Sequence, residues 1–577
     1  MRSIALGKGL LPRTDNSCKT HLVSNPTPVH NSQTLWLAAC MLLLALGISV
    51  PSAGAQTQPD ASSLLGQNQQ ITAELALPAG SVTKVEQTIS HTVALGGAKV
   101  AIDKVGIDTV AIHGTSVFSE ATLIGILGHV KGMHYDMEGL QGLADTITNH
   151  YRKAGFLFAS AYLPPQSISG GALVIEVLEG RYGSIATAGE GAIAQPARAY
   201  LQALKPGAVI TQAQLTRAVL ILGDLPSITV KPVLRPGTEL NTANLEVMVS
   251  EARSWDGSLI LDNHSSRYTG EVNGRISLGF NDVLGFGDRL SLLWVDSLRG
   301  GTYGESTTYE VGYGFALGND GLLGKALMSQ STYALGHEFV GFSGRAKAIS
   351  MGLSYPLIRS MQTNLTISVD YEHDQLNDSL NGISFSQQTS RVVSSGLKFD
   401  HRDGWFGGGQ TFGSLTLDSG KLWPTASGSL VNHVSKLVVD VSRQQSLFGP
   451  LSLLMHVNGH TNANPLNDYH KTALGGVRGV RAYPSGESVG ASGGHMQTEL
   501  NYGFGTYQPF AFYDIGAITK QTTHAARTLS GYGLGLRIAQ GTFQGALSAA
   551  WKGVGGLAQS DTQQRKPRIW THIKFSF

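Results

Sequence analysis

The segment LGGVRGVRAYPSGESVG runs from Leu474 to Gly490, and the segment FAFYDIGAI follows it from Phe510 to Ile518. The first is a glycine-rich loop that carries Arg481, and the second alternates like a β-strand around Asp514. A guanidinium enclosed in a narrow polar space requires a carboxylate, and its planar fork matches the two carboxylate oxygens. The two segments therefore place a cation and an anion of matching geometry in one strand-rich part of the chain.

The same alternation extends over the whole C-terminal part of the chain. Beyond Ser254 the helical period disappears, and apolar and polar residues alternate at period two. One such strand sets Val272, Ile276, Leu278 and Phe280 against Asn273, Arg275, Ser277 and Asn281. Another sets Leu365, Ile367, Val369 and Tyr371 against Thr366, Ser368, Asp370 and Glu372. One apolar and one polar face fit either a soluble β-sandwich or a membrane β-barrel.

Length and composition favour the barrel. About 324 residues without a helical segment or a cysteine are many for one sandwich, and at roughly twenty residues per strand and loop they hold about 16 antiparallel strands. The chain contains 72 glycines, which suits tight turns, and beyond the leader no run approaches the roughly 18 apolar residues of a spanning helix. The alternation continues to Phe577, as expected for a closing strand with a terminal aromatic residue at the membrane interface.

Two small α+β units precede the predicted barrel. In the first, a strand at residues 107–114 is followed by a helix that Asp136 caps, and two strands close the unit by residue 180. In the second, the sequence TQAQ from Thr211 to Gln214 is a capping box that starts an amphipathic helix. Both units follow the order strand, helix, helix, strand, strand, which indicates a repeat.

The first 55 residues have the features of a signal peptide, with an apolar core from Leu35 to Val50 and a small-residue cleavage site ending at Ala55. The basic region before the core is long, which indicates either an extended signal peptide or a start site set too early. Cys18 and Cys40 both lie in this leader, so the mature chain is predicted to have no disulfide and no thiolate chemistry. Its net charge, about −1, gives no indication of nucleic acid as a partner.

These features together resemble the ShlB/FhaC/HecB family of hemolysin secretion/activation proteins, the outer-membrane transporters of two-partner secretion. The segments that carry the resemblance are LPPQSISGGALVIEVLEG (residues 163–180), DNHSSRYTGEVNGRISLGFNDVLGFGDRL (residues 262–290), and the two segments quoted first. The resemblance implies two periplasmic POTRA domains followed by a membrane β-barrel.

On this basis we predict five segments. They are a signal peptide (1–55), an N-terminal plug helix with linker (56–98), a first POTRA domain (99–180), a second POTRA domain (181–253) and the transmembrane β-barrel (254–577).

The resemblance also implies site residues. The VRGY tetrad of the family's sixth loop corresponds to Val480, Arg481, Ala482 and Tyr483, and its FxDxG strand motif corresponds to Phe512, Asp514 and Gly516. In the family, the loop folds back into the barrel and its arginine contacts the strand aspartate.

Two departures from the family pattern concern the conformation of this loop. Ala482 replaces the glycine of the tetrad, and Ala491 stands where a Gly-Asp dipeptide usually follows. A second match, VRGV at residues 477–480, makes Arg478 an alternative lumen arginine; the register of Tyr483 with the preceding glycines favours Arg481.

The function implied by the resemblance is export of one secreted partner exoprotein of the hemolysin or filamentous adhesin type, unfolded, from the periplasm across an outer membrane. The alternative within the superfamily is an outer-membrane protein insertase, which usually carries more POTRA units. An extended client can add a strand to a POTRA sheet edge, and the residues predicted to bind it are Phe156, Phe158, Leu215, Val219 and Leu222.

The sequence does not predict an enzyme. GESVG, at residues 486–490, matches the nucleophile-elbow pattern around Ser488, but it lacks the preceding strand and following helix. The histidines show no HExxH or closely spaced ligand set, and the glycine-rich runs lack the context of a dinucleotide site. No metal, no cofactor, no small-molecule substrate and no nucleic acid are predicted, and the lipid of the outer membrane is the other expected partner.

Overall fold

A computed structural model describes residues 104–189, 193–226, 228–424, 431–462, 471–519 and 526–577. The predicted signal peptide and plug helix lie outside the described residues. Within these ranges, no helix combines the length and the hydropathy needed to cross a membrane.

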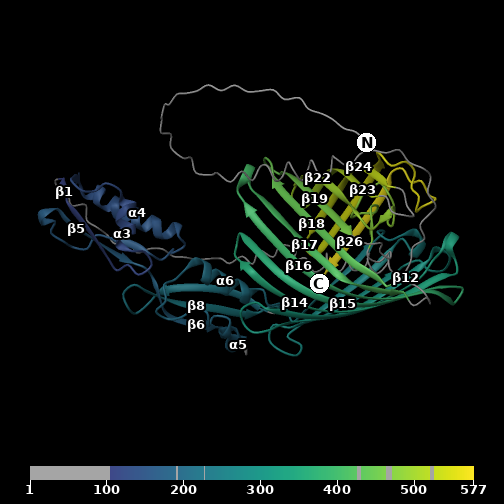
Figure 1. The fold of residues 1–577 in the computed structure, drawn as a ribbon, viewed down its shortest axis with the longest axis horizontal. Coiled ribbons are helices and arrows are strands. Elements are labelled where there is room, and N and C mark those ends of the chain that lie inside the picture. The colour runs from purple at the N-terminus through teal and green to yellow at the C-terminus, as the bar shows by residue number, and fades with distance from the viewer. Residues whose placement is uncertain (1–103, 190–192, 227, 425–430, 463–470, 520–525) are drawn as a thin grey trace, which may run out of the picture. The chain divides into compact units, whose positions relative to one another are not determined.

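The first unit is a small sheet covered by two helices (Figure 1). Its strands are ordered β2-β5-β4, with β1 and β3 as a separate antiparallel pair. Asp136 caps the longer helix by accepting a hydrogen bond from the Gly139 N–H at 2.9 Å. The helix then buries Leu140, Ile147 and Tyr151 against the sheet. The elements are β1 (Val105–Ile107), β2 (Thr109–His113), α3 (Glu120–Leu127), β3 (Met133–Tyr135), α4 (Met137–Lys153), β4 (Ser160–Tyr162) and β5 (Ala172–Leu178).

The second unit repeats this plan with the strand order β6-β8-β7. The Thr211 side chain accepts a hydrogen bond from the Gln214 N–H at 3.3 Å, which starts the second helix where the capping box predicts. The sequence predicts the first helix over residues 195–204; it ends at Ala199, after which hydrogen bonds between residues three apart continue the chain in tight turns to Leu204. The elements are β6 (Arg181–Ala188), α5 (Ala194–Ala199), α6 (Gln212–Gly223), β7 (Ile228–Pro236) and β8 (Thr242–Glu251).

A fully buried carboxylate, Glu179, lies where the first unit passes into the second. It accepts hydrogen bonds from the backbone N–H groups of Ser116 (2.6 Å) and Val117 (2.8 Å) and from the Tyr151 hydroxyl (3.1 Å). The Ser116 hydroxyl also donates to it, and the half-exposed Arg181 guanidinium lies 3.0 Å away. Burial alone raises the pKa of this carboxyl, but the donors from Ser116, Val117 and Tyr151 outweigh it, so that the pKa is lowered.

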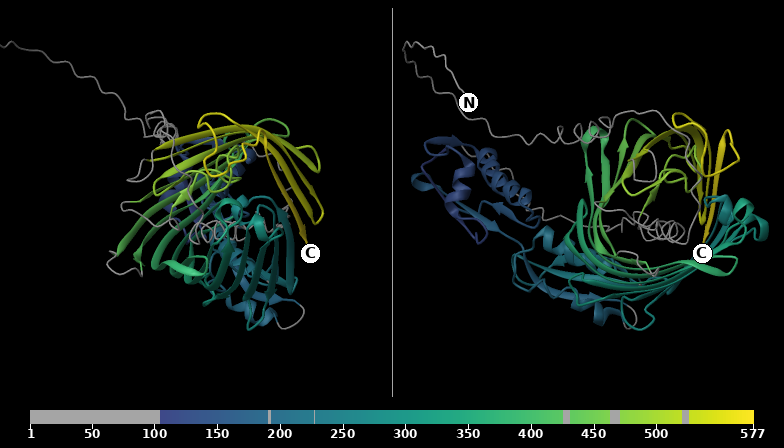
Figure 2. Two further views of the ribbon diagram at one scale, coloured as in Figure 1. Left: turned by 90° about the vertical axis from the view of Figure 1, so that its right-hand side faces the viewer. Right: turned by 45° about the vertical axis from the view of Figure 1, so that its right-hand side comes forward.

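The remaining described residues form a closed antiparallel barrel of 16 strands, as predicted (Figures 1 and 2). The strands follow one another in chain order, and the last pairs with the first. They are β9 (Trp255–Asp262), β10 (Asn273–Asn281), β11 (Arg289–Ser297), β12 (Glu305–Ala316), β13 (Leu323–Ala334), β14 (Phe342–Arg359), β15 (Thr363–Leu380), β16 (Ile383–Asp403), β17 (Gly409–Pro424), β18 (Asn432–Ser446), β19 (Leu451–Asn462), β22 (Gly493–Tyr502), β23 (Tyr507–Ile518), β24 (Arg527–Gln540), β25 (Phe543–Lys552) and β26 (Arg568–Ser576).

Closure of the sheet decides against the soluble sandwich. The backbone of Phe577 exchanges two hydrogen bonds with that of Gly257, at 3.0 and 3.1 Å, so the aromatic C-terminus lies at the closing seam. Asn273 and Arg275 of β10 are buried inside, whereas Ile276 is exposed on the outside. The alternation read from the sequence is therefore polar toward the lumen and apolar toward the surroundings, as a membrane barrel requires.

Candidate functional site

The sixth loop lies inside the barrel wall and not in solvent. We call residues 471–492, the described part of the connection between β19 and β22, loop 6. A two-residue ladder between β20 (Thr472–Ala473) and β21 (Val489–Gly490) closes its base. Val480, Ala482 and Tyr483 are fully buried and pack with apolar residues of β23 and β24.

Arg481 is the centre of the site. Its Nε and Nη2 donate to the two oxygens of Asp514, at 2.9 and 2.6 Å, and its backbone N–H donates to the same carboxylate at 3.0 Å. Arg481 is 4% exposed and Asp514 is 0% exposed. A bidentate, charge-assisted pair removed from solvent in this way fixes both the position and the orientation of the loop.

A second carboxylate, which the motifs did not indicate, completes the charge balance. Glu499 of β22 accepts a hydrogen bond from Arg481 Nη1 and another from Arg537 Nη2 at 2.7 Å. Two guanidinium groups thus face two carboxylates, and the Arg481 guanidinium also lies 3.7 Å from the centroid of the Phe512 ring. In the sequence, Glu499 is distinguished only as a polar residue on the inward face of a strand. Many other residues of the lumen share this feature.

Arg481, and not Arg478, contacts the strand aspartate. Every hydrogen bond that the Asp514 carboxylate accepts from a described residue comes from Arg481. Arg478 is three residues earlier and half-buried. The register chosen from Tyr483 therefore places the arginine beside its carboxylate.

The alanine that replaces the family glycine fits because the wall opposite is a glycine. The backbone of Ala482 is not in the left-handed region, so a side chain is tolerated there. A Cβ built on Gly531 of β24 would lie 2.5 Å from the Ala482 Cβ. Gly531 thus leaves the space that Ala482 occupies. Gly516 of the strand motif has a similar role, because a Cβ there would lie 2.9 Å from the His495 Cβ.

Three further hydrogen-bond contacts hold the tetrad against the last strands. The Trp570 Nε1 of β26 donates to the Arg481 carbonyl at 2.7 Å. The Tyr483 hydroxyl donates to the carbonyls of Val554 and Gly556, at 3.0 and 3.1 Å. All three partners belong to the end of the barrel that closes the seam, so loop 6 and the closing strands form one bonded unit.

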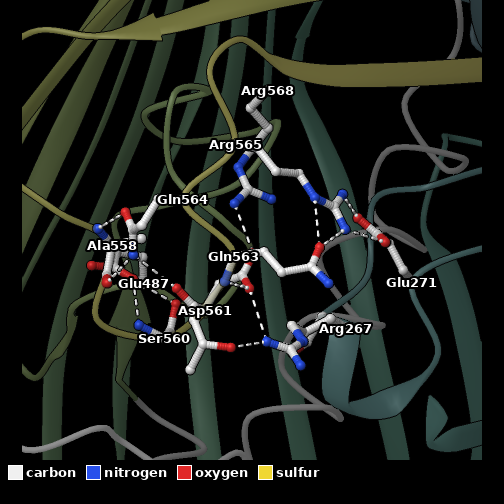
Figure 3. A network of polar contacts seen from close by, with 12 residues as sticks. Arg267, Glu271, Glu487, Ala558, Ser560, Asp561, Gln563, Gln564, Arg565 and Arg568 are labelled. Atoms are coloured by element: carbon white, nitrogen blue, oxygen red, sulfur yellow. Dashed lines mark hydrogen bonds and ion pairs between the residues drawn. The ribbon is translucent and has the colours of Figure 1, made fainter. Parts of the chain in front are cut away.

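The outer half of loop 6 is fixed by a third buried carboxylate, Glu487 (Figure 3). It accepts hydrogen bonds from the backbone N–H groups of Gln559 (2.8 Å) and Ser560 (2.8 Å) and from the Ser560 hydroxyl (2.5 Å). It also forms an ion pair with Arg527 of β24. Gln559 and Ser560 belong to the connection between β25 and β26, residues 553–567, which we call the last loop.

The last loop is in turn bonded to the first loop, residues 263–272, across the closing seam (Figure 3). Asp561 accepts hydrogen bonds from Arg267 at 3.2 Å and from Arg568 at 2.9 Å. Arg565 pairs with both oxygens of Glu271. The seam between β26 and β9 thus carries ionic contacts at its loop end as well as backbone pairing.

The predicted client-binding residues of the first unit lie beside a sheet edge. Among the described strands, β4 pairs only with β5, so no strand covers its other edge, and the Ala161 N–H of β4 donates to the Thr148 hydroxyl of α4 at 2.8 Å. Phe156 and Phe158 precede β4 and are both partly buried; Phe156 packs on the core of the first unit and Phe158 on that of the second.

The predicted client-binding residues of the second unit are corrected by the structure. Leu215, Val219 and Leu222 are 7%, 3% and 0% exposed, and all three belong to the hydrophobic core of their own unit. These residues were predicted to contact a client, but they form the side of α6 that packs on the sheet of its own unit. Arg217 of the same helix donates to the Pro356 carbonyl of β14 at 2.9 Å.

The backbone around Ser488 differs from that of the nucleophile elbow of a serine hydrolase. Ser488 has a positive φ of 55°, and its hydroxyl accepts a hydrogen bond from Arg527 at 2.8 Å. It is followed by the two-residue strand β21 and not by a helix, so it lacks the setting of a nucleophile elbow. In the part of the chain that the structure describes, no group of three or more His, Cys, Asp or Glu residues is placed to hold a metal ion.

Comparison with known proteins places these features in a family. Residues 241–538 match the family described as haemolysin secretion/activation protein ShlB/FhaC/HecB, and residues 105–180 match the POTRA domain of the ShlB type. The chain belongs to the ShlB/FhaC/HecB family. Members are outer-membrane transporters of two-partner secretion, so this chain is such a transporter and not an enzyme, with its barrel in the outer membrane and its POTRA domains in the periplasm.

Individual relatives agree at low identity. The heme/hemopexin transporter protein HuxB of Haemophilus influenzae is 24% identical over 415 residues, which cover 68% of this chain and 72% of the relative. The outer membrane transporter CdiB of Escherichia coli is 23% identical over 468 residues, covering 77% and 78%. The solved structure of CdiB from Escherichia coli superposes with a TM-score of 0.71, covering 91% of this chain and all of that one at 19% identity. CdiB from Acinetobacter baumannii gives a TM-score of 0.65 at 18% identity, covering 89% and 97%.

Proposed function

We propose that this transporter recognises one secreted partner exoprotein in the periplasm and conducts it, unfolded, through the barrel to the cell surface. The observation that carries the proposal is the buried pairing of Arg481 with Asp514 and Glu499, which anchors loop 6 to the barrel wall. A loop anchored by an ion pair has two defined states, paired and released, and this property suits an element that moves when a client enters.

We propose that the residues of the site act together to hold loop 6 against the barrel wall. Val480, Ala482 and Tyr483 supply the apolar contacts of the loop, while Phe512 and Gly516 shape the wall around Asp514. Release of Arg481 requires that two carboxylates lose a partner at once, so the loop has a strong preference for the paired state.

Client recognition is proposed at the edge of β4 that no described strand covers. An extended chain can add a strand there through main-chain hydrogen bonds, with Phe156 and Phe158 as the nearest aromatic residues. The three core residues of α6 are not part of this proposal, because a client strand would have to open the domain to reach them. The periplasm supplies no ATP, so folding of the client outside the cell is the proposed driving force.

We propose the domain limits that the sequence indicated, with POTRA domains at residues 99–180 and 181–253 and the barrel at residues 254–577. The signal peptide and the plug helix, residues 1–55 and 56–98, remain part of the proposal. The partners are the single exoprotein and the surrounding outer-membrane lipid, without nucleic acid or a small-molecule substrate.

The test compares the proteins of the culture supernatant and of the cell surface in cells that lack the gene and in complemented cells. Loss of one large exported protein, restored by complementation, is the expected result and identifies the client. Loss of many barrel proteins at once would contradict the proposal in favour of an insertase, and no change in either fraction would contradict dedicated export.

A further inference from the structure

The outward face of strands β14–β18 carries basic side chains directly above the apolar belt of the barrel. β9 leaves the periplasmic domains and successive strands alternate in direction, so β14 begins at the outer surface of the membrane. Each of the basic residues lies two or four positions from an outward apolar residue of its own strand, and therefore on the same face. We call the set the basic band: Arg345 and Lys347 of β14, His373 of β15, Arg391 of β16, Lys421 of β17 and His433 of β18.

Four members of the band form one row across neighbouring strands. His373 is the direct partner of Arg391, Arg391 of Lys421, and Lys421 of His433. Four adjacent strands span about 14 Å at the usual spacing. Arg391 and Lys421, the two cations in directly opposed positions of this row, repel each other and destabilise the sheet unless an anion lies over them.

The part of the chain that the structure describes supplies no such anion. Among the described residues, Arg345, Lys347, Arg391 and Lys421 take part in no ion pair. The acidic residues of the outer halves of these strands alternate to the lumen side; they are Glu372, Asp374, Asp378 and Asp418. Lys325, which faces the lumen, shows the contrast, since it pairs with Asp370 at 2.7 Å.

Two residues of the band, Arg345 and Lys347, line a cavity. A cavity of about 240 Å³ lies between the outer ends of β14, β15 and β16, and its lining includes Arg345, Lys347 and Thr389. The Arg391 guanidinium lies 5.3 Å from the centroid of the Trp423 ring, which holds it against the wall. One step below the row the surface becomes apolar, with Met351 60% exposed and Tyr371 45% exposed.

We propose that the basic band binds the phosphate groups of the glycolipid in the outer leaflet, the lipid A part of lipopolysaccharide. A phosphorylated headgroup sits where the apolar belt ends, which is the level of the band, and its acyl chains continue down the belt beside Met351 and Tyr371. Basic clusters at a membrane interface bind anionic headgroups in this way. Phosphate oxygens between Arg391 and Lys421 neutralise the repulsion within the row.

The test measures retention of lipid A by the full-length transporter in detergent, using native mass spectrometry after addition of diphosphoryl lipid A. In the triple variant Lys347→Gln, Arg391→Gln, Lys421→Gln we expect affinity to fall roughly tenfold or more, since one charge-assisted hydrogen bond accounts for about one factor of ten. Lipid A without phosphates should bind the unmodified transporter as weakly as diphosphoryl lipid A binds the variant.

A matched variant controls for total charge. Lys131→Gln, Lys205→Gln, Lys231→Gln removes three exposed cations from the periplasmic domains and should retain lipid A normally. If the band variant does not reach the heat-modifiable folded form, the pair Lys347→Gln, Lys421→Gln leaves the Arg391 contact with Trp423 intact and replaces it in the assay.

Three results would overturn the proposal. They are equal retention by the band variant and the unmodified protein, equal loss in the control variant, and displacement of lipid A by inorganic phosphate at the same concentration, which would indicate a simple anion site. None of these results depends on export of a client, so the proposal stands or falls separately from the proposed function.

Discussion

Asp514 in the barrel wall and Glu179 between the periplasmic domains are both fully buried carboxylates, and they are satisfied by different means. Asp514 is held by one buried residue, Arg481, through two bonds from the guanidinium and one from the backbone N–H. Glu179 is held mainly by neutral donors, with Arg181 at the half-exposed margin. Removing a buried partner charge leaves the other charge uncompensated, whereas removing a neutral donor leaves a gap in a shared network. Loop 6 should therefore respond sharply to single substitutions and the domain junction more gradually.

The largest effect is expected for Arg481→Ala. The change leaves Asp514 and Glu499 without their shared cation and should cost about 3 kcal/mol of the free energy that holds loop 6 in place. We expect export of the client to be lost while the heat-modifiable barrel is still inserted. Secretion of the client and membrane fractionation measure the two effects in the same cells.

Two variants make the comparison sharper. Arg478→Ala removes a cation from the same loop without touching Asp514 and should reduce export less. Arg481→Lys keeps the charge but not the planar fork, so an intermediate phenotype is expected. A larger defect in Arg478→Ala than in Arg481→Ala would show that Arg478, and not Arg481, is the arginine that anchors loop 6.

The next effect concerns the wall on which loop 6 rests. Gly531→Ala adds a Cβ 2.5 Å from the Ala482 Cβ and 3.2 Å from the Trp551 carbonyl oxygen, so the loop must shift. Overpacking of this kind costs about 1–3 kcal/mol. Protease accessibility of loop 6 on intact cells should increase.

The double variant Gly531→Ala, Ala482→Gly tests whether the steric account is right. Removing the Ala482 methyl group restores the space and should return protease accessibility toward that of the unmodified protein. If the double variant were no better than Gly531→Ala alone, the close approach of the two residues would not be the cause.

A smaller effect is expected at the outer anchor of loop 6. Glu487→Gln removes the charge that faces Arg527 and places amide hydrogens against the N–H groups of the last loop, which should cost about 2 kcal/mol. Because the Arg481 pairing remains, we expect export to continue at a reduced rate and ion conductance in planar bilayers to become noisier. Conductance traces as quiet as those of the unmodified protein would mean that Glu487 does not restrain the loop.

Local patterns and motifs predicted a large part of this molecule, and three-dimensional neighbours explain what they missed. Period-two alternation predicted the barrel, and the length of the alternating part of the chain predicted the number of strands. Both predictions were possible because successive residues of a strand point to its two opposite faces. Glu499 and Arg537 were missed because their importance comes from facing Arg481 and Phe510 across strands, which no short motif records. The stripe of α6 was misread for the same reason, since a pattern shows that a face is apolar but not which element covers it.

The smallest effect, and the one that depends on pH, is expected at Glu179. Burial raises its pKa, but the donors of Ser116, Val117 and Tyr151 lower it below the ordinary carboxyl value. A carboxyl whose pKa is lower in the folded state stabilises that state at pH values above its unfolded pKa, about 4.3, and loses this contribution as the pH falls through the folded pKa. Hydrogen exchange of residues 104–251 in the full-length transporter should therefore show faster opening at pH 4 than at pH 7. Glu179→Gln should weaken the domains at pH 7 and flatten this pH dependence, whereas Glu239→Gln, on an exposed turn, should leave both unchanged. If Glu179→Gln opened as slowly as the unmodified protein at both pH values, the carboxylate would not stabilise the junction, and the contrast with Asp514 would have to be explained by packing alone.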